Sequence, residues 1–132
     1  MIQSIPNFHD GYVTGLKVRE GGATLYLQQV DGADFNLILE DLEALQIDDF
    51  RQGNIISHVD IIAGRLLSTD ALDRLYEPPH PAAAAQYHEK HASFVKGQVE
   101  RIQRGEAQLL VIVPSYGADL LAICQQVHCV AA

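Results

Sequence analysis

Polar and apolar residues alternate through much of the first forty positions, and this pattern predicts three β-strands. Alternation with a period of two places successive side chains on opposite faces of a sheet. The predicted strands are Tyr12–Arg19, Ala23–Val30 and Phe35–Leu39. Turns at Glu20-Gly21-Gly22 and Asp31-Gly32 separate them, because glycine adopts positive φ at little cost. We expect these strands to form an antiparallel meander.

A fourth strand is predicted at Asn54–Ala63, after an irregular segment. Glu40–Gly53 follows neither the helical nor the strand period, and we interpret it as a crossover that could include one helical turn. One face of the fourth strand is expected to be the more apolar. It comprises Ile55, Ser57, Val59 and Ile61.

The middle of the chain predicts two helices separated by a proline-rich hinge. Ser68-Thr69-Asp70 is typical of a helix start, since hydroxyl oxygens accept hydrogen bonds from first-turn amides. That helix must end before Pro78-Pro79-His80-Pro81, and Pro81 can open the next helix. The second helix, Ala82–Arg104, is amphipathic. Its apolar arc consists of Tyr87, His91, Phe94, Val95, Gln98 and Ile102.

Two further strands, predicted at Gln108–Val113 and Ala118–Val130, complete the chain with a hairpin across Pro114-Ser115-Tyr116-Gly117. The predicted element order is therefore β-β-β-β-α-α-β-β. Grouped helices between antiparallel hairpins indicate an α+β fold: a largely antiparallel sheet of about six strands, with one long amphipathic helix packed on one face. A length of 132 residues fits one domain, spanning 1–132.

The composition indicates a soluble, acidic protein and disfavours nucleic acid as a partner. Hydrophobic residues make up 48% of the chain, enough for a core, and the formal net charge is −8. Seven acidic residues and no Lys or Arg lie between Asp31 and Asp49, and this stretch would repel a phosphate backbone. The same acidity could attract a basic protein partner, or serve only to keep the chain in solution.

The sequence predicts a cytoplasmic location. Its apolar runs are far shorter than the roughly 20 residues that cross a bilayer, so we expect no membrane association. Met1 to Asp10 lacks the basic and apolar regions of a secretory signal. Cys124 and Cys129 lie too far apart along one extended strand to form a disulfide, as expected in a reducing compartment.

A histidine cluster is the best candidate for metal chemistry. His88 and His91 are three residues apart on the predicted helix, where both can face one point, and His80 could approach from the hinge. Together they could bind zinc or a similar divalent metal. Further ligands could come from His9, His58 or Asp60. The spacing differs from the zinc-protease pattern, and the alternative places His91 at the helix–sheet interface with His88 at its rim.

No other segment carries a recognisable catalytic set. Phe8-His9-Asp10-Gly11 is interpreted as a turn and not as a general-base pair, because adjacent residues of an extended chain point to opposite faces. Ser115 lacks the preceding glycine and the strand-to-helix context of a nucleophile elbow. We therefore predict no catalytic residue, and no cofactor apart from the metal alternative.

The opening Phe8-His9-Asp10, followed at once by the β-meander, resembles small bacterial domains of unknown function. Some of these domains are similar to immunity proteins that neutralise toxins. The resemblance extends through Asn54-Ile55-Ile56. It implies a protein that binds a partner, and it carries over no catalytic residue.

Two functions remain open from the sequence. The first is a non-catalytic protein-interaction or assembly module, immunity-like in one version, that binds another protein or a second copy of itself. The long strands Asn54–Ala63 and Ala118–Val130 could pair with such a chain. The alternative is a metal-binding protein or metal-dependent enzyme that uses the histidine cluster. A small-molecule pocket beside the long helix, lined by Tyr87, His91 and Phe94, is a third hypothesis.

Overall fold

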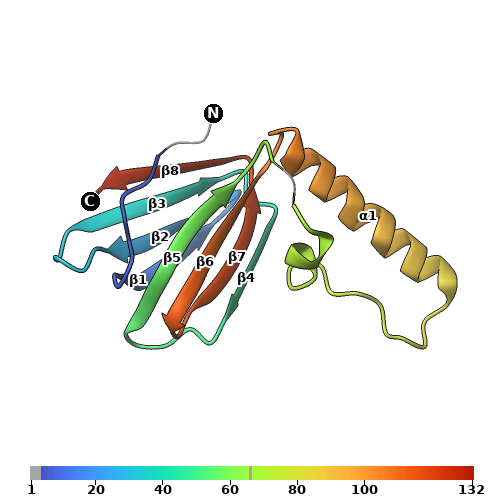
Figure 1. Ribbon diagram of the computed structural model, residues 1–132, viewed down its shortest axis with the longest axis horizontal. Coiled ribbons are helices and arrows are strands. Elements are labelled where there is room, and N and C mark those ends of the chain that lie inside the picture. Colours follow the sequence, from blue (N-terminus) through green and yellow to red (C-terminus); the bar gives the residue numbers. More distant parts are fainter. Residues whose placement is uncertain (1–3, 66) are drawn as a thin grey trace.

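The computed structural model describes residues 4–65 and 67–132, and within them the chain forms one antiparallel sheet and one α-helix (Figure 1). The strand order in the sheet is β4-β7-β6-β5-β1-β2-β3-β8. The strands are β1 (Tyr12–Arg19), β2 (Gly22–Gln28), β3 (Asp34–Glu40), β4 (Ala44–Asp48), β5 (Asn54–Ile62), β6 (Gln108–Tyr116), β7 (Asp119–Cys124) and β8 (Gln126–Ala131). Between β5 and β6 lie the 3₁₀-helix η1 (Thr69–Leu72) and the helix α1 (Ala85–Gln103).

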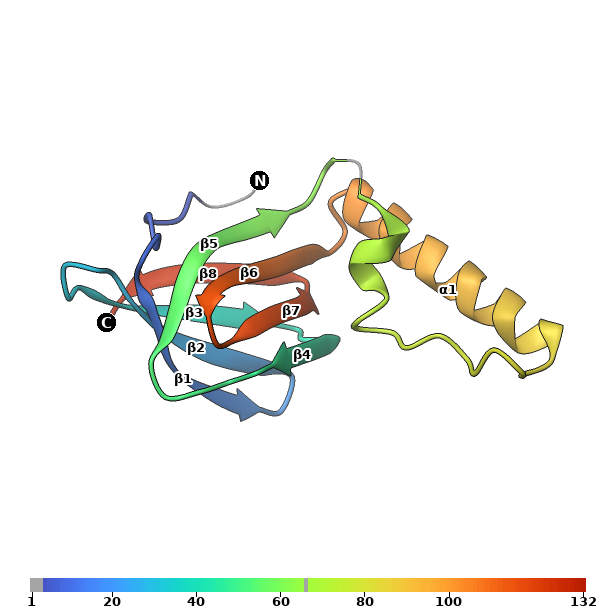
Figure 2. The same ribbon diagram turned by 60° about the horizontal axis from the view of Figure 1, so that its bottom comes forward.

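Two long bent strands curl the sheet on itself (Figure 2). β3 leads into β4 through Asp41, whose φ of 53° turns the backbone, and β7 leads into β8 through Gln125. β3 pairs with β8, and β4 pairs with β7, both in antiparallel fashion. The two bent strands therefore pair with each other along both of their halves, and this pairing joins the two ends of the sheet. The Gln125 amide donates to the Glu40 carbonyl at 3.0 Å where they bend. The sheet therefore has the form of an incomplete barrel.

The interior of this barrel is an aliphatic core, supplied by the inward-facing positions of its strands. The largest fully enclosed side chains are Leu25, Leu27, Leu37, Leu39, Ile56, Leu110, Ile112 and Leu120. Phe8 joins them from the chain before β1, and its ring meets that of Phe35 edge-on with 5.6 Å between the centroids. Burial of Phe8 thus ties the segment before β1 to the core.

The segment between β5 and β6 forms a helical arm that packs on the outer face of the sheet. Val95, Val99 and Ile102 in the later half of α1 are buried in a cluster with Leu109 of β6 and Ile123 of β7. The first ten residues of α1 contribute no buried side chain, and Figure 1 shows this end of the helix extending beyond the sheet. In the described part of the chain, no helix has both the length and the apolar character to span a bilayer.

Two arginines fasten the helical arm to the β4–β7 end of the sheet. Arg101 of α1 donates from both terminal nitrogens to the Glu43 carboxylate, at 2.7 and 2.8 Å. Arg74, just after η1, donates to Asp48 of β4 at 2.7 Å and to Asp119 of β7 at 3.0 Å. Charge-assisted hydrogen bonds of this kind fix geometry as well as adding energy. These hydrogen bonds orient the helical arm at the edge of its apolar contacts with the sheet.

The predicted fold, an α+β sheet of about six strands with two helices, is wrong. The structure has eight strands in a single sheet and one α-helix within the described residues. β4 was not predicted because most of its side chains are half-buried, with no alternation to mark a strand. The predicted strand Ala118–Val130 is divided at Gln125, and Ser68-Thr69-Asp70 opens only a 3₁₀ turn.

An irregular register also corrects the predicted inner face of β5. Its pairing with β6 shifts between Ile55 and Ile56, and again between Ile56 and His58. Such a bulge moves the following side chains to the other face. Ile56 therefore shares the core with Val59 and Ile61, and Ile55 does not.

The Glu43–Arg101 pair makes attachment of the helical arm sensitive to acid. The hydrogen bond from Arg101, together with its charge, holds the pKa of Glu43 below its ordinary value, against the opposing effect of partial burial. A lowered folded-state pKa contributes stability above the unfolded-state pKa, and this stability is lost as the pH falls through the folded-state value.

We therefore expect Glu43→Gln to lower the free energy of unfolding by about 1 kcal/mol at pH 7, and by progressively less as the pH falls below about 4.3, the ordinary pKa of glutamate. Urea unfolding of both proteins across this range measures the difference. A difference that does not change with pH would contradict the contribution of the ion pair.

Candidate functional site

Strand β1 extends past the first residue of β5, and the fork between β1 and the loop that precedes β5 is the candidate site. Their pairing consists of Tyr12 with Ile55 and Val13 with Asn54. A bulge in β1 between Val13 and Gly15 shifts its register against β2. Bulges increase the local bend and twist of a strand. Because β5 begins at Asn54, opposite Val13, β1 continues beyond Val13 with β2 as its strand partner in the described part of the chain.

The loop before β5, residues 49–53, is held by the side chain of Asn54, which is 1% exposed. Its Oδ1 accepts hydrogen bonds from the Arg51 amide at 2.8 Å and from the Ala118 amide at 2.9 Å. Its Nδ2 donates to the Val13 carbonyl at 3.2 Å and to the Arg51 carbonyl at 2.6 Å. These four bonds match the two donors and two lone pairs of a carboxamide. One buried side chain thus joins the loop, β1 and the β6–β7 turn.

The β6–β7 turn fits closely around this side chain. Gly117 is buried with φ of 85°, and a Cβ at this position would collide with Oδ1 of Asn54. Glycine supplies both the positive φ and the space. Asp49 and Gly53, with φ of 59° and 84°, bend the loop at its two ends. The loop conformation is therefore set by its own backbone as well as by Asn54.

The loop and the end of β6 present three large side chains to solvent, and we call Phe50, Arg51 and Tyr116 the platform. Phe50 is 48% exposed and Tyr116 is 49% exposed. The Arg51 guanidinium carbon lies 5.7 Å from the centroid of the Tyr116 ring, within cation–π range. Arg51 also donates from Nε to Asp49 at 2.7 Å. Aromatic and arginine side chains are enriched among the residues that dominate binding energy at protein interfaces.

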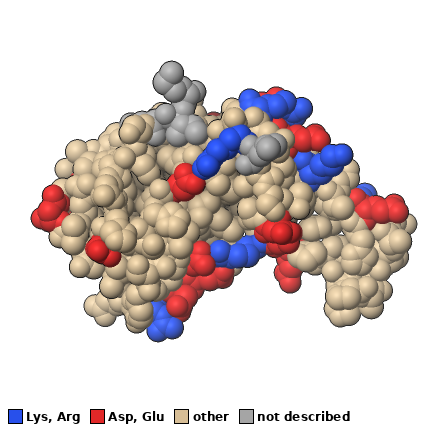
Figure 3. All heavy atoms as spheres, viewed as in Figure 1, with Lys and Arg blue, Asp and Glu red and all other residues tan. Residues whose placement is uncertain are grey.

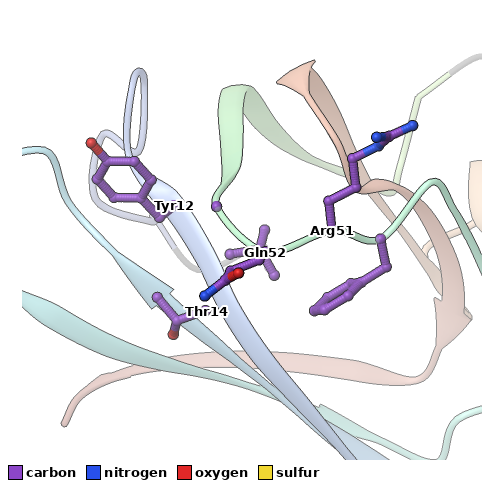
Figure 4. Close-up of a pocket in the computed structure, with 7 residues that line it drawn as sticks. Tyr12, Thr14, Arg51 and Gln52 are labelled. Carbon is purple, nitrogen blue, oxygen red and sulfur yellow. The ribbon is translucent and has the colours of Figure 1, made fainter.

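A hollow of about 560 Å³ lies beside the platform, between β1 and the loop (Figure 4). Its lining residues are Tyr12, Val13, Thr14, Phe50, Arg51, Gln52 and Gly53. Figure 4 shows Thr14 and Gln52 beside one another, with Arg51 directed away from β1. The exposed surface of the lining is mainly apolar. The hollow is thus suited to an apolar side chain, with polar groups at its margin.

The histidines predicted as metal ligands lie in the helical arm. His91 donates from Nε2 to the Tyr76 carbonyl at 2.8 Å, and His80 accepts at Nδ1 from the Ala82 amide at 3.0 Å. His88 is half-buried, one turn before His91. Within residues 4–65 and 67–132, no group of three His, Cys, Asp or Glu side chains could hold a metal ion. The zinc site stays a prediction, with no cluster in the described residues to support it.

The further ligands considered with them have other contacts. The His9 ring donates to the Ser57 carbonyl at 2.8 Å, within a turn that Asp10 makes at φ of 61°. Asp60 accepts from Arg65 at 2.7 Å. His58 Nδ1 lies 3.5 Å from the Ser57 hydroxyl oxygen, and none of the three side chains belongs to a group of three candidate ligands in the described residues.

The aromatic residues predicted to line a small-molecule pocket pack within or along the arm. Phe94 meets the Tyr76 ring edge-on, with 4.8 Å between the centroids. Tyr87 borders a separate hollow of about 330 Å³ together with Gln86 and Lys90. These positions give no support to a shared pocket at Tyr87, His91 and Phe94.

The platform residues were not predicted as site residues from the sequence. Phe50 lies in the segment predicted as an irregular crossover. The one sign of a special role in its sequence is that it is an apolar residue that fits neither the helical nor the strand period. Tyr116 was assigned to a hairpin turn. Asn54 contacts groups 41 and 64 positions away in the chain, and no local pattern indicates such contacts.

No protein-family model, curated protein or solved structure matches the chain. The resemblance to immunity-like bacterial domains therefore stays a prediction.

Asn54→Ala should destabilise the protein by roughly 3 kcal/mol, because it removes four hydrogen bonds and leaves buried backbone groups without partners. Urea unfolding followed by circular dichroism measures the change. Gln52→Ala, an exposed residue of the same loop, is the matched control and should change stability by less than about 0.5 kcal/mol. Equal effects of the two substitutions would contradict the role given to Asn54.

Proposed function

We propose that this protein is a non-catalytic protein-interaction module and that the platform, with its adjoining hollow, is its binding surface. The observation that carries the proposal is that Phe50, Arg51 and Tyr116 are exposed side chains on a backbone fixed by Asn54. A partner chain that covers them would gain apolar burial and a desolvated arginine–aromatic contact.

Preorganisation of the backbone supports this proposal. Binding costs conformational entropy when loops become ordered at an interface. Asn54 already bonds both the amide and the carbonyl of Arg51, so the centre of the loop is ordered before any partner arrives. The platform can therefore bind with a smaller entropic cost than a mobile loop carrying the same residues.

The acidic stretch from Asp31 to Asp49 gives less guidance on the partner than its charge suggests. Several of its carboxylates already contact cationic or titratable side chains. These pairs are Glu40–His128, Glu43–Arg101, Asp48–Arg74 and Asp49–Arg51. On the face drawn in Figure 3, blue and red side chains likewise lie beside each other. Immunity-like binding and homodimerisation are both forms that the proposed function can take.

Site-specific cross-linking tests the proposal. A photoreactive amino acid at position 50 should yield discrete cross-linked products in the cells that produce the protein, because this position faces the partner. Mass spectrometry of the products identifies the cross-linked chain, including a second copy. Adding Tyr116→Ser should weaken the products by roughly tenfold, as expected when one central contact of an interface is lost.

The matched control carries the same photoreactive amino acid at Val30, which is 67% exposed in the β2–β3 turn. This position should give no discrete product. The same products at both positions, or none at position 50, would contradict the platform as a binding surface.

A further inference from the structure

We infer that the fork binds an extended, acidic segment of another protein that adds as a strand to the free edge of β1. The inference rests on the proposed function and specifies the chemistry of the partner. Beyond Val13, β1 has no backbone partner on its β5 side among the residues that the structure describes. In the described part of the chain, residues 15–19 pair with β2 alone, and Thr14 lies at the bulge.

An edge of this kind offers a template for backbone hydrogen bonding. In an antiparallel pair, alternate backbone groups of a strand point to its partner and the rest point away from it. Half of the amides and carbonyls along residues 14–19 are therefore directed to the side beyond the first residue of β5, where no strand of the described chain lies opposite them. An extended segment can satisfy them by pairing along the edge, and recognition then depends on its side chains.

The hollow provides the place for an apolar anchor of the added strand. Val13 and Thr14 contribute to its wall where the free edge begins, and Phe50 contributes from the loop. Side chains on one face of a strand recur at every second residue. One apolar side chain of the segment can therefore enter the hollow while its backbone continues along β1.

The charges on β1 favour acidic residues in the segment. Lys17 and Arg19 are exposed, and neither has a carboxylate partner in the described part of the chain. Arg19 donates to the neutral hydroxyl of Thr24 at 2.9 Å, whereas each of the other arginines bonds a carboxylate. Acidic side chains opposite Lys17 and Arg19 would give favourable cross-strand pairs. Glu20 lies in the adjoining turn and would repel an acidic residue there. The acidic residues of the bound segment are therefore expected alongside the strand and not beside the turn.

A displayed library of random twelve-residue peptides, selected on the whole chain, tests this inference. The selected peptides should combine an aromatic or aliphatic residue with several Asp or Glu residues. When a selected peptide is added to the ¹⁵N-labelled protein, hydrogen exchange at outward-facing amides of residues 14–19 should slow by about tenfold or more, because the added strand protects them. The paired substitutions Lys17→Glu and Arg19→Glu should weaken binding by about tenfold.

The matched control is the pair Lys90→Glu and Lys96→Glu, which makes the same charge change on exposed positions of α1. It should alter the affinity by less than about twofold. Equal losses in the two variants, selected peptides without acidic residues, or protection of β4 or α1 in place of residues 14–19 would each overturn the inference.

The two proposals fail in different ways. Cross-links at position 50, combined with peptides that protect another surface, would leave the platform as an interface and remove strand addition. Peptides that protect residues 14–19 while position 50 gives no cross-link would retain strand addition and remove the platform as the cellular binding surface.

Discussion

The buried carboxamide of Asn54 is the contact on which the arrangement of the fork depends. It bonds four backbone groups from the loop before β5, from β1 and from the β6–β7 turn. A buried amide costs free energy unless its hydrogen-bonding groups are satisfied, and here all of them are. The same four bonds that permit burial also fix three segments relative to one another. The positions of Phe50, Arg51 and Tyr116 follow from this one side chain and from the space that Gly117 leaves for it.

The rest of the fold explains why a fork exists at all. The bent strands β3–β4 and β7–β8 hold the far ends of the sheet together, while β5 begins at Asn54 and pairs only with the start of β1. The barrel is therefore closed on one side and open on the other. Its open side carries an apolar hollow, a strand edge and two cations, and among the described residues the edge has no backbone partner and the cations have no carboxylate partner. These features are costly for a chain that never binds another, because free edges invite unspecific pairing.

Much of the strand content could be predicted because the inner and outer faces of β1, β2 and β3 differ in polarity. Strands and faces were predicted wrongly where that difference disappears or changes side. The residues of β4 are mostly half-buried, the register of β5 shifts at Ile56, and the last predicted strand bends at Gln125. The candidate site could not be predicted for a related reason. Asn54 looks like an ordinary first residue of a strand, and its partners Val13 and Ala118 are distant in the chain.

Hydrogen exchange of the Arg51 and Ala118 amides, measured by NMR on the unmodified protein, tests the central claim most directly. Both amides donate to Oδ1 of Asn54. The account predicts that they exchange about as slowly as the amides of the barrel core, because only opening of the fork would expose them. Exchange as fast as that of an unstructured peptide would show that the loop and turn open independently, and would contradict a fork held by Asn54.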